Sequence, residues 1–265
     1  MKPFFVTIPH SGEQVPGEVT WLQGLPEVTL MRDVDRFVDR LYEPVLKELQ
    51  IDCIVTQWHR YVVDLNRLED DVDCDSVLDS SNPSGSFATG LHWRWTTQQE
   101  ILIKEPMTRK LHDQLVKQYF QPFHRSVRQL YEKFKAQGFK KIYHLDAHSM
   151  PSLGTSAHKD PGQQRAEVVV SDMEGKSCEP EFRDLVVEAY KKAGFEVRLN
   201  FPYVGGRVTQ TYGKPDLGQH AIQVELNRRL YMNEDTKELK LENLKGIQQS
   251  LSEAISYIYR QINEI

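Results

Sequence analysis

The chain has 265 residues, of which 39% are hydrophobic and 27% charged, and its formal net charge is −5. This composition is typical of an ordinary globular protein, and the length suits a single α/β domain over residues 1–265. The acidic balance argues against nucleic acid as a partner, because binding phosphates needs a basic face. The longest apolar runs fall far short of the ~20 residues of a membrane helix, so no membrane partner is expected.

The first nine residues carry one positive charge but lack the long apolar region and the small-residue cleavage site of a signal peptide. The three cysteines, Cys53, Cys74 and Cys178, form neither an even disulfide framework nor a C-x-x-C pair. We therefore expect reduced thiols and a cytoplasmic protein.

Strands and helices are predicted to alternate along the chain. Residues 3–9 are rich in β-forming side chains and predict a first strand that ends at His10. Apolar residues at helical spacing predict one long helix over 26–49. Two further strands are predicted at 51–57 and 61–65.

The second half begins after a polar segment, 69–90, whose length and composition make it a candidate flap over an active site. Beyond it, helices are predicted at 108–137, 179–193 and 241–262, and strands at 140–147, 166–171, 195–199 and 221–226. Pro122 should kink or split the first of these helices. The alternation predicts an α/β fold with a mainly parallel sheet and a site at the strand ends.

The segment from His144 to His148 places polar residues at every second position of an apolar strand, so His144, Asp146 and His148 share one face. Burying such a face is costly unless the polar groups find partners, and a metal ion would be one. A hydrogen-bonded or exposed strand end is the alternative. His148, nearest the following loop, is the better ligand candidate, and Asp146 could orient a ligand.

His10 also follows a strand, and a second strand-end histidine is what a three-ligand catalytic zinc site needs. Taken alone, a histidine before Ser-Gly is more often a turn residue. Asp33 or Asp35 would be the simplest third ligand. Both could instead be favourable charges near a helix N-terminus.

Glu225 is an acidic residue in the apolar strand predicted at 221–226. Facing a metal site, it would be a general base. The alternative is an outward-facing glutamate that pairs with Arg228 or Arg229.

Two arginines could hold an acidic substrate, because arginine binds carboxylates through two parallel hydrogen bonds. Arg67 follows Asn66 after an apolar segment, and Arg207 lies in a Gly-Gly loop. Most arginines are surface residues, which is the alternative for both. The chain has no G-x-S-x-G elbow, no glycine-rich nucleotide loop and no H-E-x-x-H motif.

Seven blocks in fixed order are more specific than any one of these signals: PHSG at 9–12, DVDRFVDRLY at 33–42, RYVVDLNR at 60–67, LDAHSM at 145–150, NFPYVGG at 200–206, YGKP at 212–215 and QVELNR at 223–228. Over nearly its whole length the chain resembles the N-formylglutamate amidohydrolase family.

This resemblance implies a three-layer α/β fold with a mixed, mainly parallel sheet, similar to the zinc carboxypeptidases and other phosphorylase/hydrolase-like proteins. It implies one zinc ion held by His10, Asp35 and His148. Asp146 would not bind the ion but would orient one of these ligands. Asp35 is preferred to Asp33 because its spacing to the residues after it matches the family pattern.

The resemblance also implies Glu225 as the catalytic residue, and Arg60, Asn66, Arg67 and Arg207 as the residues that hold substrate carboxylates. The expected reaction is hydrolysis of the amide of a small, acidic N-acyl amino acid. N-formyl-L-glutamate, which would give formate and L-glutamate, is the leading substrate. The alternatives are another N-acyl amino acid or short peptide, and a non-catalytic protein that binds small acids. The protein is expected to be a monomer or a small homo-oligomer.

One segment departs from the family pattern. Family members usually have a Pro-, Cys- and Thr-containing segment after the Thr-Gly-Leu that matches 89–91, whereas His92-Trp93-Arg94-Trp95 follows here. We expect this bulkier, aromatic surface to reshape the substrate pocket.

Overall fold

One six-stranded sheet, in the order β2-β1-β3-β6-β4-β5, forms the centre of the computed structural model, which describes residues 2–156 and 158–265. The strands are β1 (Phe4–Ile8), β2 (Asp52–Val55), β3 (Ile142–Met150), β4 (Val168–Ser171), β5 (Val197–Leu199) and β6 (Gln219–Asn227). Only β4 and β6 pair in antiparallel fashion; the other neighbours are parallel. The predicted mixed, mainly parallel α/β sheet is therefore confirmed.

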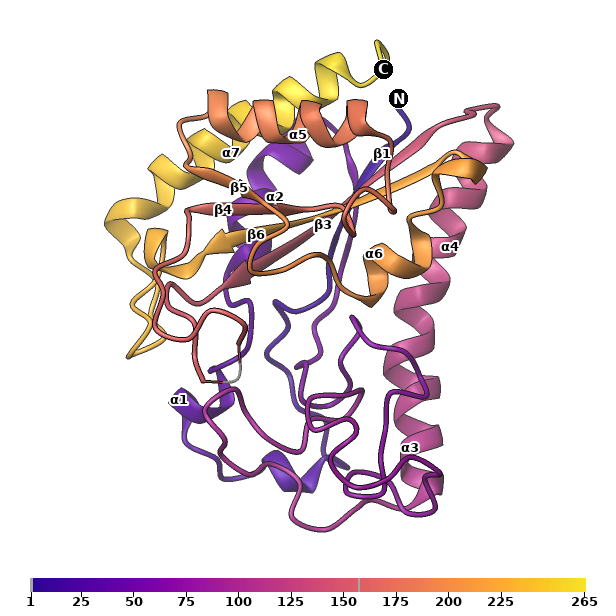
Figure 1. Cartoon of the computed structure of the whole chain (residues 1–265), viewed down its shortest axis with the longest axis vertical. Helices are drawn as coiled ribbons and strands as arrows, with labels where there is room; N and C mark the ends of the chain where they lie inside the picture. The colour runs from indigo at the N-terminus through magenta and orange to yellow at the C-terminus, as the bar shows by residue number, and fades with distance from the viewer. Residues whose placement is uncertain (1, 157) are drawn as a thin grey trace.

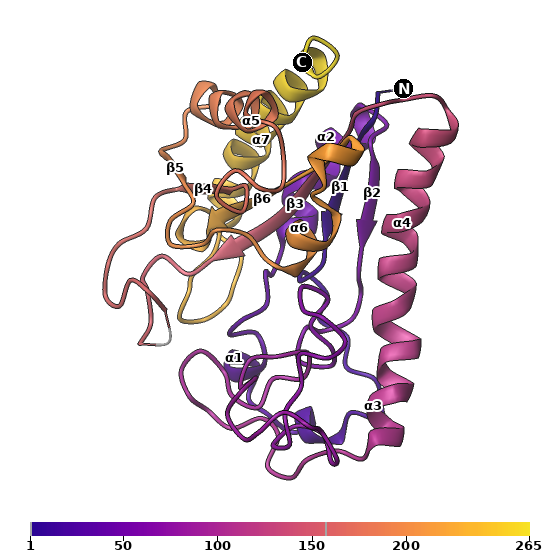
Figure 2. The same ribbon diagram turned by 45° about the vertical axis from the view of Figure 1, so that its right-hand side comes forward.

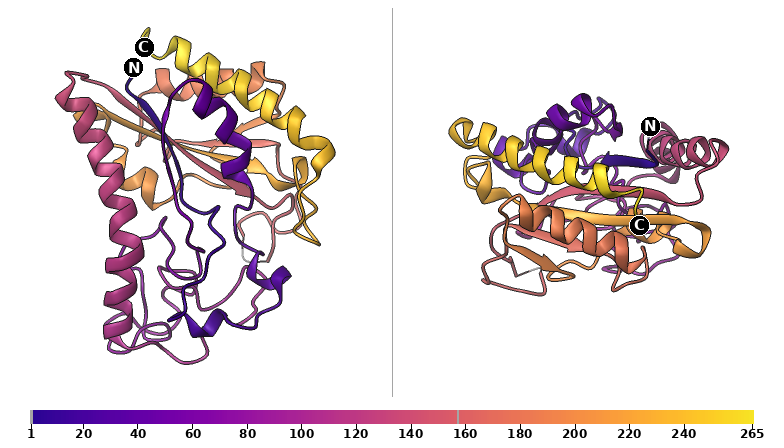
Figure 3. Two further views of the ribbon diagram at one scale, coloured as in Figure 1. Left: turned by 180° about the vertical axis from the view of Figure 1, so that it is seen from behind. Right: turned by 90° about the horizontal axis from the view of Figure 1, so that it is seen from above.

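Helices cover both faces of this sheet and make three layers (Figures 1 and 3). On one face, α2 (Val38–Glu48), α5 (Pro180–Lys192) and α7 (Leu241–Gln261) share an apolar core with the sheet, and α7 packs against the other two. On the other face, α4 (Gln121–Ala136) and α6 (Arg207–Tyr212) contribute to a second core. The shorter helices are α1 (Glu27–Leu30), α3 (Arg109–Leu115) and the 3-10 turns Thr20–Leu22, Pro215–Leu217 and Arg228–Leu230.

Beyond the ends of β1 and β2, the chain forms a lobe of loops (Figure 2). It contains the polar segment 69–90, which has no helix or strand. The Asp73 carboxylate accepts a hydrogen bond from the Phe87 backbone N–H at 2.8 Å, which fastens the end of that segment to its beginning. Its role as a flap stays a prediction.

The single helix predicted over 26–49 is wrong, because residues 31–37 leave the helical conformation between α1 and α2. Phe37 adopts a left-handed backbone with φ 71°. The backbone N–H of Asp35 donates to the carbonyl of His10 at 2.9 Å instead of to a helical partner. The apolar side chains of this segment are buried although the segment is not a helix. Their helical spacing therefore predicted the wrong structure.

The strand predicted over 61–65 is also wrong. The N–H of Val62 donates to the carbonyl of His59 at 2.9 Å, which makes a turn. The Asp64 carboxylate accepts from the N–H of Asn66 at 2.8 Å. The apolar side chains that predicted a strand are buried in the second core, where they need no strand partner.

The helix predicted over 108–137 is present, with a local change in its hydrogen bonding. Thr108 caps it by accepting from the N–H of Leu111 at 3.2 Å. The chain then passes from α3 through a π-helical turn at Val116–Phe120 into α4. This wider turn comes just before Pro122, which has no N–H to donate, so the predicted disturbance takes the form of a π turn.

No helix within the described residues is long and apolar enough to cross a membrane.

Stability should fall on acidification because α4 carries a buried histidine, His124. Its Nε2 donates to the carbonyl of Leu65 at 3.0 Å, and its Nδ1 accepts from the Tyr212 hydroxyl at 2.9 Å. Burial lowers the pKa of His124 to about 4. In the unfolded chain this imidazole takes up a proton at about pH 6.5. Lowering the pH from about 7 to about 5 should therefore reduce the free energy of unfolding by about 2 kcal/mol through this group.

Denaturant unfolding at both pH values measures this loss, and His124→Gln should show a smaller pH dependence than the wild type. Equal pH dependence in the two proteins would contradict the assignment.

Candidate active site

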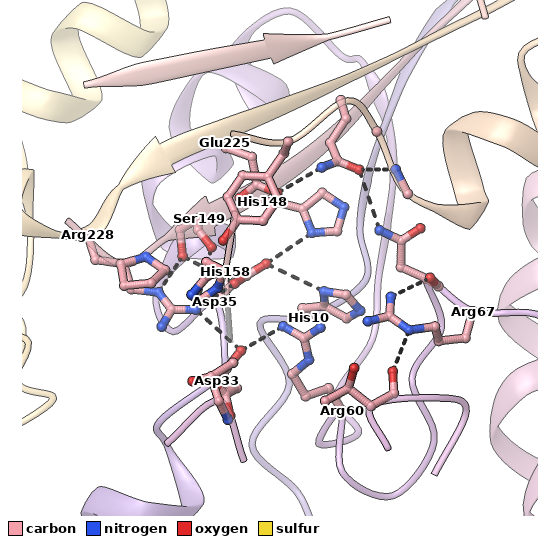
Figure 4. Close-up of a pocket in the computed structure, with 18 of the residues that line it drawn as sticks. His10, Asp33, Asp35, Arg60, Arg67, His148, Ser149, His158, Glu225 and Arg228 are labelled. Atoms are coloured by element: carbon pink, nitrogen blue, oxygen red, sulfur yellow. Dashed lines mark hydrogen bonds and ion pairs between the residues drawn. The ribbon is translucent and has the colours of Figure 1, made fainter. Parts of the chain in front are cut away.

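Polar side chains gather where β1, β3 and β6 end, and they line a cavity of about 340 Å³, the inner cavity (Figure 4). Because strand side chains alternate between faces, β3 and β6 turn apolar residues toward the helices α2, α5 and α7. Their other face carries His148, Gln223 and Glu225 into the inner cavity.

The structure brings His10, Asp35 and His148 together, with ligand atoms all within 4.8 Å of one another. Asp35 Oδ2 lies 3.0 Å from His148 Nδ1 and 3.6 Å from His10 Nδ1. All three side chains are buried. Two imidazole nitrogens and one carboxylate oxygen are a donor set that suits a catalytic zinc ion, so these residues fit a metal.

Each histidine of this cluster is held from behind by a second carboxylate. His148 Nε2 lies 2.8 Å from Asp146 Oδ2, and His10 Nε2 lies 2.8 Å from Asp64 Oδ1. Such carboxylates fix the ring and the tautomer of a metal-binding histidine. Asp64 was not predicted; its signal was a carboxylate within the apolar part of the block 60–67.

His144 lies deeper in β3 and does not line the inner cavity. Its Nε2 is 2.7 Å from the Thr7 hydroxyl, and its Nδ1 is 3.2 Å from the Tyr131 hydroxyl. The alternation of β3 therefore continues a polar face inward, where hydrogen bonds satisfy it.

Asp33 lines the inner cavity, but its carboxylate is already occupied. Oδ2 accepts from the Tyr61 hydroxyl at 2.5 Å, and Oδ1 accepts from the Thr97 hydroxyl at 2.6 Å. Of the two carboxylates considered for the third ligand, only Asp35 therefore faces both histidines.

Glu225 lies beside His148 in the register of β6 and β3. Its side chain is buried, and Oε1 accepts from Gln223 Nε2 at 2.8 Å. Burial raises the pKa of this carboxyl to about 7, and the negative charge of Asp35 adds to the effect. Within the described residues no basic side chain forms an ion pair with Glu225, so the outward-facing alternative does not hold.

Arg228 is a buried residue of the site that the sequence suggested only as a partner of Glu225. It binds Asp35 instead: Nη2 donates to Asp35 Oδ1 at 2.9 Å, and Nε donates to the Ser149 hydroxyl at 3.1 Å. Despite the cost of burial, His10, His148 and Arg228 hold the pKa of Asp35 well below its ordinary value. With Oδ1 engaged in this way, Oδ2 is left for the histidines.

Of the residues predicted to hold substrate, Arg60, Asn66 and Arg67 line the inner cavity. Arg207 does not; it lines a neighbouring cavity and pairs with Asp71 at 3.1 Å.

The aromatic segment 92–95 contributes one side chain to the inner cavity, that of Trp93. The guanidinium carbons of Arg60 and Arg67 lie 4.6 Å and 5.9 Å from the centroid of its ring. Its indole N–H donates to Asp64 Oδ2 at 2.9 Å. Trp93 therefore forms a floor beneath the two predicted substrate arginines.

A buried cluster of two histidines and an aspartate, beside a glutamate that lines the same cavity, is the arrangement typical of metal-dependent hydrolases. The sequence model of the family described as "N-formylglutamate amidohydrolase" matches residues 2–232. The chain belongs to this family.

Individual relatives agree with this membership. N-formylglutamate deformylase of Pseudomonas aeruginosa is 28% identical over 237 residues, which are 88% of this chain and 83% of that protein. N-formylglutamate deformylase of Pseudomonas putida is 27% identical over 237 residues, 88% of this chain and 82% of that protein. The crystal structure of N-formylglutamate amidohydrolase from Ralstonia eutropha superposes with a TM-score of 0.86 at 26% identity, covering 99% of this chain and 95% of that one.

Removing Arg228 should leave the Asp35 carboxylate buried without its cation. In metal-free protein, Arg228→Gln should therefore lower the free energy of unfolding by about 3–5 kcal/mol. Denaturant unfolding in the presence of a chelator measures this loss. The matched control is Arg229→Gln, because Arg229 is only half-buried and is not in the inner cavity; equal losses in the two variants would contradict the pairing.

Proposed function

We propose that this protein is a zinc-dependent deformylase that hydrolyses N-formyl-L-glutamate to formate and L-glutamate. The observation that carries the proposal is the position of Glu225, which shares the inner cavity with the His10–Asp35–His148 cluster and with the arginines Arg60 and Arg67. Membership of the N-formylglutamate amidohydrolase family supports the substrate.

His10, Asp35 and His148 would hold the ion. When bound, a divalent ion polarises the formyl carbonyl and lowers the pKa of a water molecule toward about 7. Asp64 and Asp146 contact Nε2 of the two imidazoles, which would leave Nδ1 of each ring available to the ion.

Glu225 moves the proton in this reaction. Its carboxylate accepts a proton from the attacking water, whose oxygen bonds to the formyl carbon. It then delivers that proton to the amide nitrogen as the C–N bond breaks, so formate and a free amine leave. Gln223 holds this carboxylate through Oε1.

Arg60 and Arg67 stand where they can bind the carboxylates of glutamate. Arg60 is fixed by Asp64 Oδ2 at 2.8 Å and by the carbonyl of Asp33 at 2.7 Å, while its buried Nε has no hydrogen-bond partner among the described residues. Stacking on Trp93 keeps both guanidinium groups in place. Preorganised cations reduce the entropy lost when the substrate binds.

Glu225→Gln should retain the metal and lose turnover, because the amide keeps the shape of the side chain but cannot accept the proton. A loss of about 10²–10⁴-fold in kcat is expected for a missing general base. Formate release and metal content of the same preparation are the measurements. His148→Ala should lose both metal and turnover; undiminished turnover in Glu225→Gln would overturn the role of Glu225.

Chelation should abolish formate release, and one equivalent of zinc per chain should restore it. Elemental analysis of protein purified without chelator, paired with the activity assay, gives the stoichiometry. This experiment also separates the enzyme from a protein of the same fold that only binds small acids. Full activity in protein that has been shown to be free of metal would contradict the proposal.

A further inference from the structure

A second cavity of about 550 Å³, the outer cavity, adjoins the inner cavity. Four residues line both: Arg67, Thr89, Gly205 and Gly206. They form the boundary between the two spaces. A ligand bound in the inner cavity with one end at Arg67 would therefore have that end at the entrance to the outer cavity.

Two glycines form part of this boundary, and neither position has room for a side chain. A Cβ atom at Gly206 would lie 2.0 Å from Asn66 Nδ2, and one at Gly205 would lie 2.7 Å from Met173 Sδ. Gly205 also has φ 123°, in the left-handed region that favours glycine. Neither glycine places a side chain in the boundary between the two cavities.

One hydrogen-bond donor of Arg67 is available to a ligand at this boundary. Its Nε donates to the carbonyl of Thr89 at 2.7 Å, and its Nη1 donates to the carbonyl of Asn66 at 2.9 Å. Over residues 2–156 and 158–265, Nη2 has no hydrogen-bond partner. Burial lowers the pKa of Arg67, and the cations Arg60 and Arg207 lower it further, against the opposing charges of Asp64 and Asp71. An anion or a carbonyl oxygen here would reduce the repulsion among the three arginines.

The outer cavity has more positive than negative charge. Its charged lining residues are Arg67, Arg207 and Asp71. Asp71 pairs with Arg207 Nε at 3.1 Å. This pair offsets the charge of Arg207 and leaves the positive charge of Arg67 at the boundary. The rest of the lining is backbone and small, apolar or neutral polar side chains, so an extension with a terminal carboxylate fits its chemistry.

We propose that the outer cavity is a second substrate subsite, which takes an acidic residue joined by an amide bond to a carboxyl group of the N-formylglutamyl unit. The substrate class then includes N-formylglutamyl dipeptides as well as the free N-formyl amino acid. This inference rests on the proposed function. The reaction stays the same: water adds to the formyl carbon, the formamide C–N bond breaks, and the added amide bond remains intact.

The test compares N-formyl-L-glutamate with N-formyl-L-glutamyl-L-glutamate, linked through either the α- or the γ-carboxyl, on the metal-loaded protein. At least one dipeptide should release formate with a kcat/KM no lower than that of N-formyl-L-glutamate. Arg207→Gln should lower the ratio of the two kcat/KM values, dipeptide over free acid, about tenfold, mainly through the KM of the dipeptide. Arg198→Gln, which removes an exposed arginine on β5, is the matched control and should leave the ratio unchanged.

Failure of this inference and failure of the proposed function give different results. Turnover of N-formyl-L-glutamate without turnover of either dipeptide would overturn the subsite, as would an unchanged ratio in Arg207→Gln. If no formyl compound is turned over, the proposed function fails. Calorimetric titration with the two dipeptides then tests the subsite independently of turnover. In that case, weaker dipeptide binding by Arg207→Gln than by the wild type supports the subsite, and equal binding overturns it.

Discussion

Burial of the Asp35 carboxylate is the constraint on which the rest of the site depends. A buried carboxylate costs several kcal/mol unless cations and donors surround it, and here each oxygen has its own set. Oδ2 faces His10 and His148, while Oδ1 accepts from Arg228 and from the Ser149 hydroxyl. These partners lie at the ends of β1, β3 and β6, so compensation of one charge fixes three parallel strands relative to the segment between α1 and α2.

The lobe of loops forms the walls of the inner cavity that the sheet does not provide. The strands and their ends position His10, His148 and Glu225 along fixed directions, but a pocket also needs walls on the side away from the sheet. Arg60, Asp64, Arg67 and Trp93 all come from the irregular chain between β2 and α3. Asp64 accepts from Arg60 and Trp93 and contacts His10, while Arg67 donates to the carbonyls of Asn66 and Thr89. The lobe of loops and the strand ends therefore meet at the His10–Asp64 contact.

Local patterns in the sequence predicted the sheet, most helices and the polar face of β3, because alternation and helical spacing are properties of neighbouring residues. These patterns predicted the wrong structure where apolar residues are buried in loops rather than in a helix or a strand. The apolar residues of 31–37 and 61–65 are buried although they lie in loops, so period alone could not separate them from a helix or a strand. Arg228 and Asp64 acquire their partners through contacts far apart in the chain. Those contacts are set by the fold, so the local sequence marked Asp64 only as a carboxylate among apolar residues and could not show the partner of either residue.

Trp93 gives the cavity an internal reporter. Its indole lies against the guanidinium groups of Arg60 and Arg67 and donates to Asp64, which in turn contacts His10. The emission of an indole responds to the electric field across its ring. A carboxylate arriving at Arg67 and a cation arriving beside His10 both change that field. The chain has four tryptophans, so the part of the fluorescence change that Trp93→Phe removes records the filling of the cavity, without a chemical label and independently of turnover.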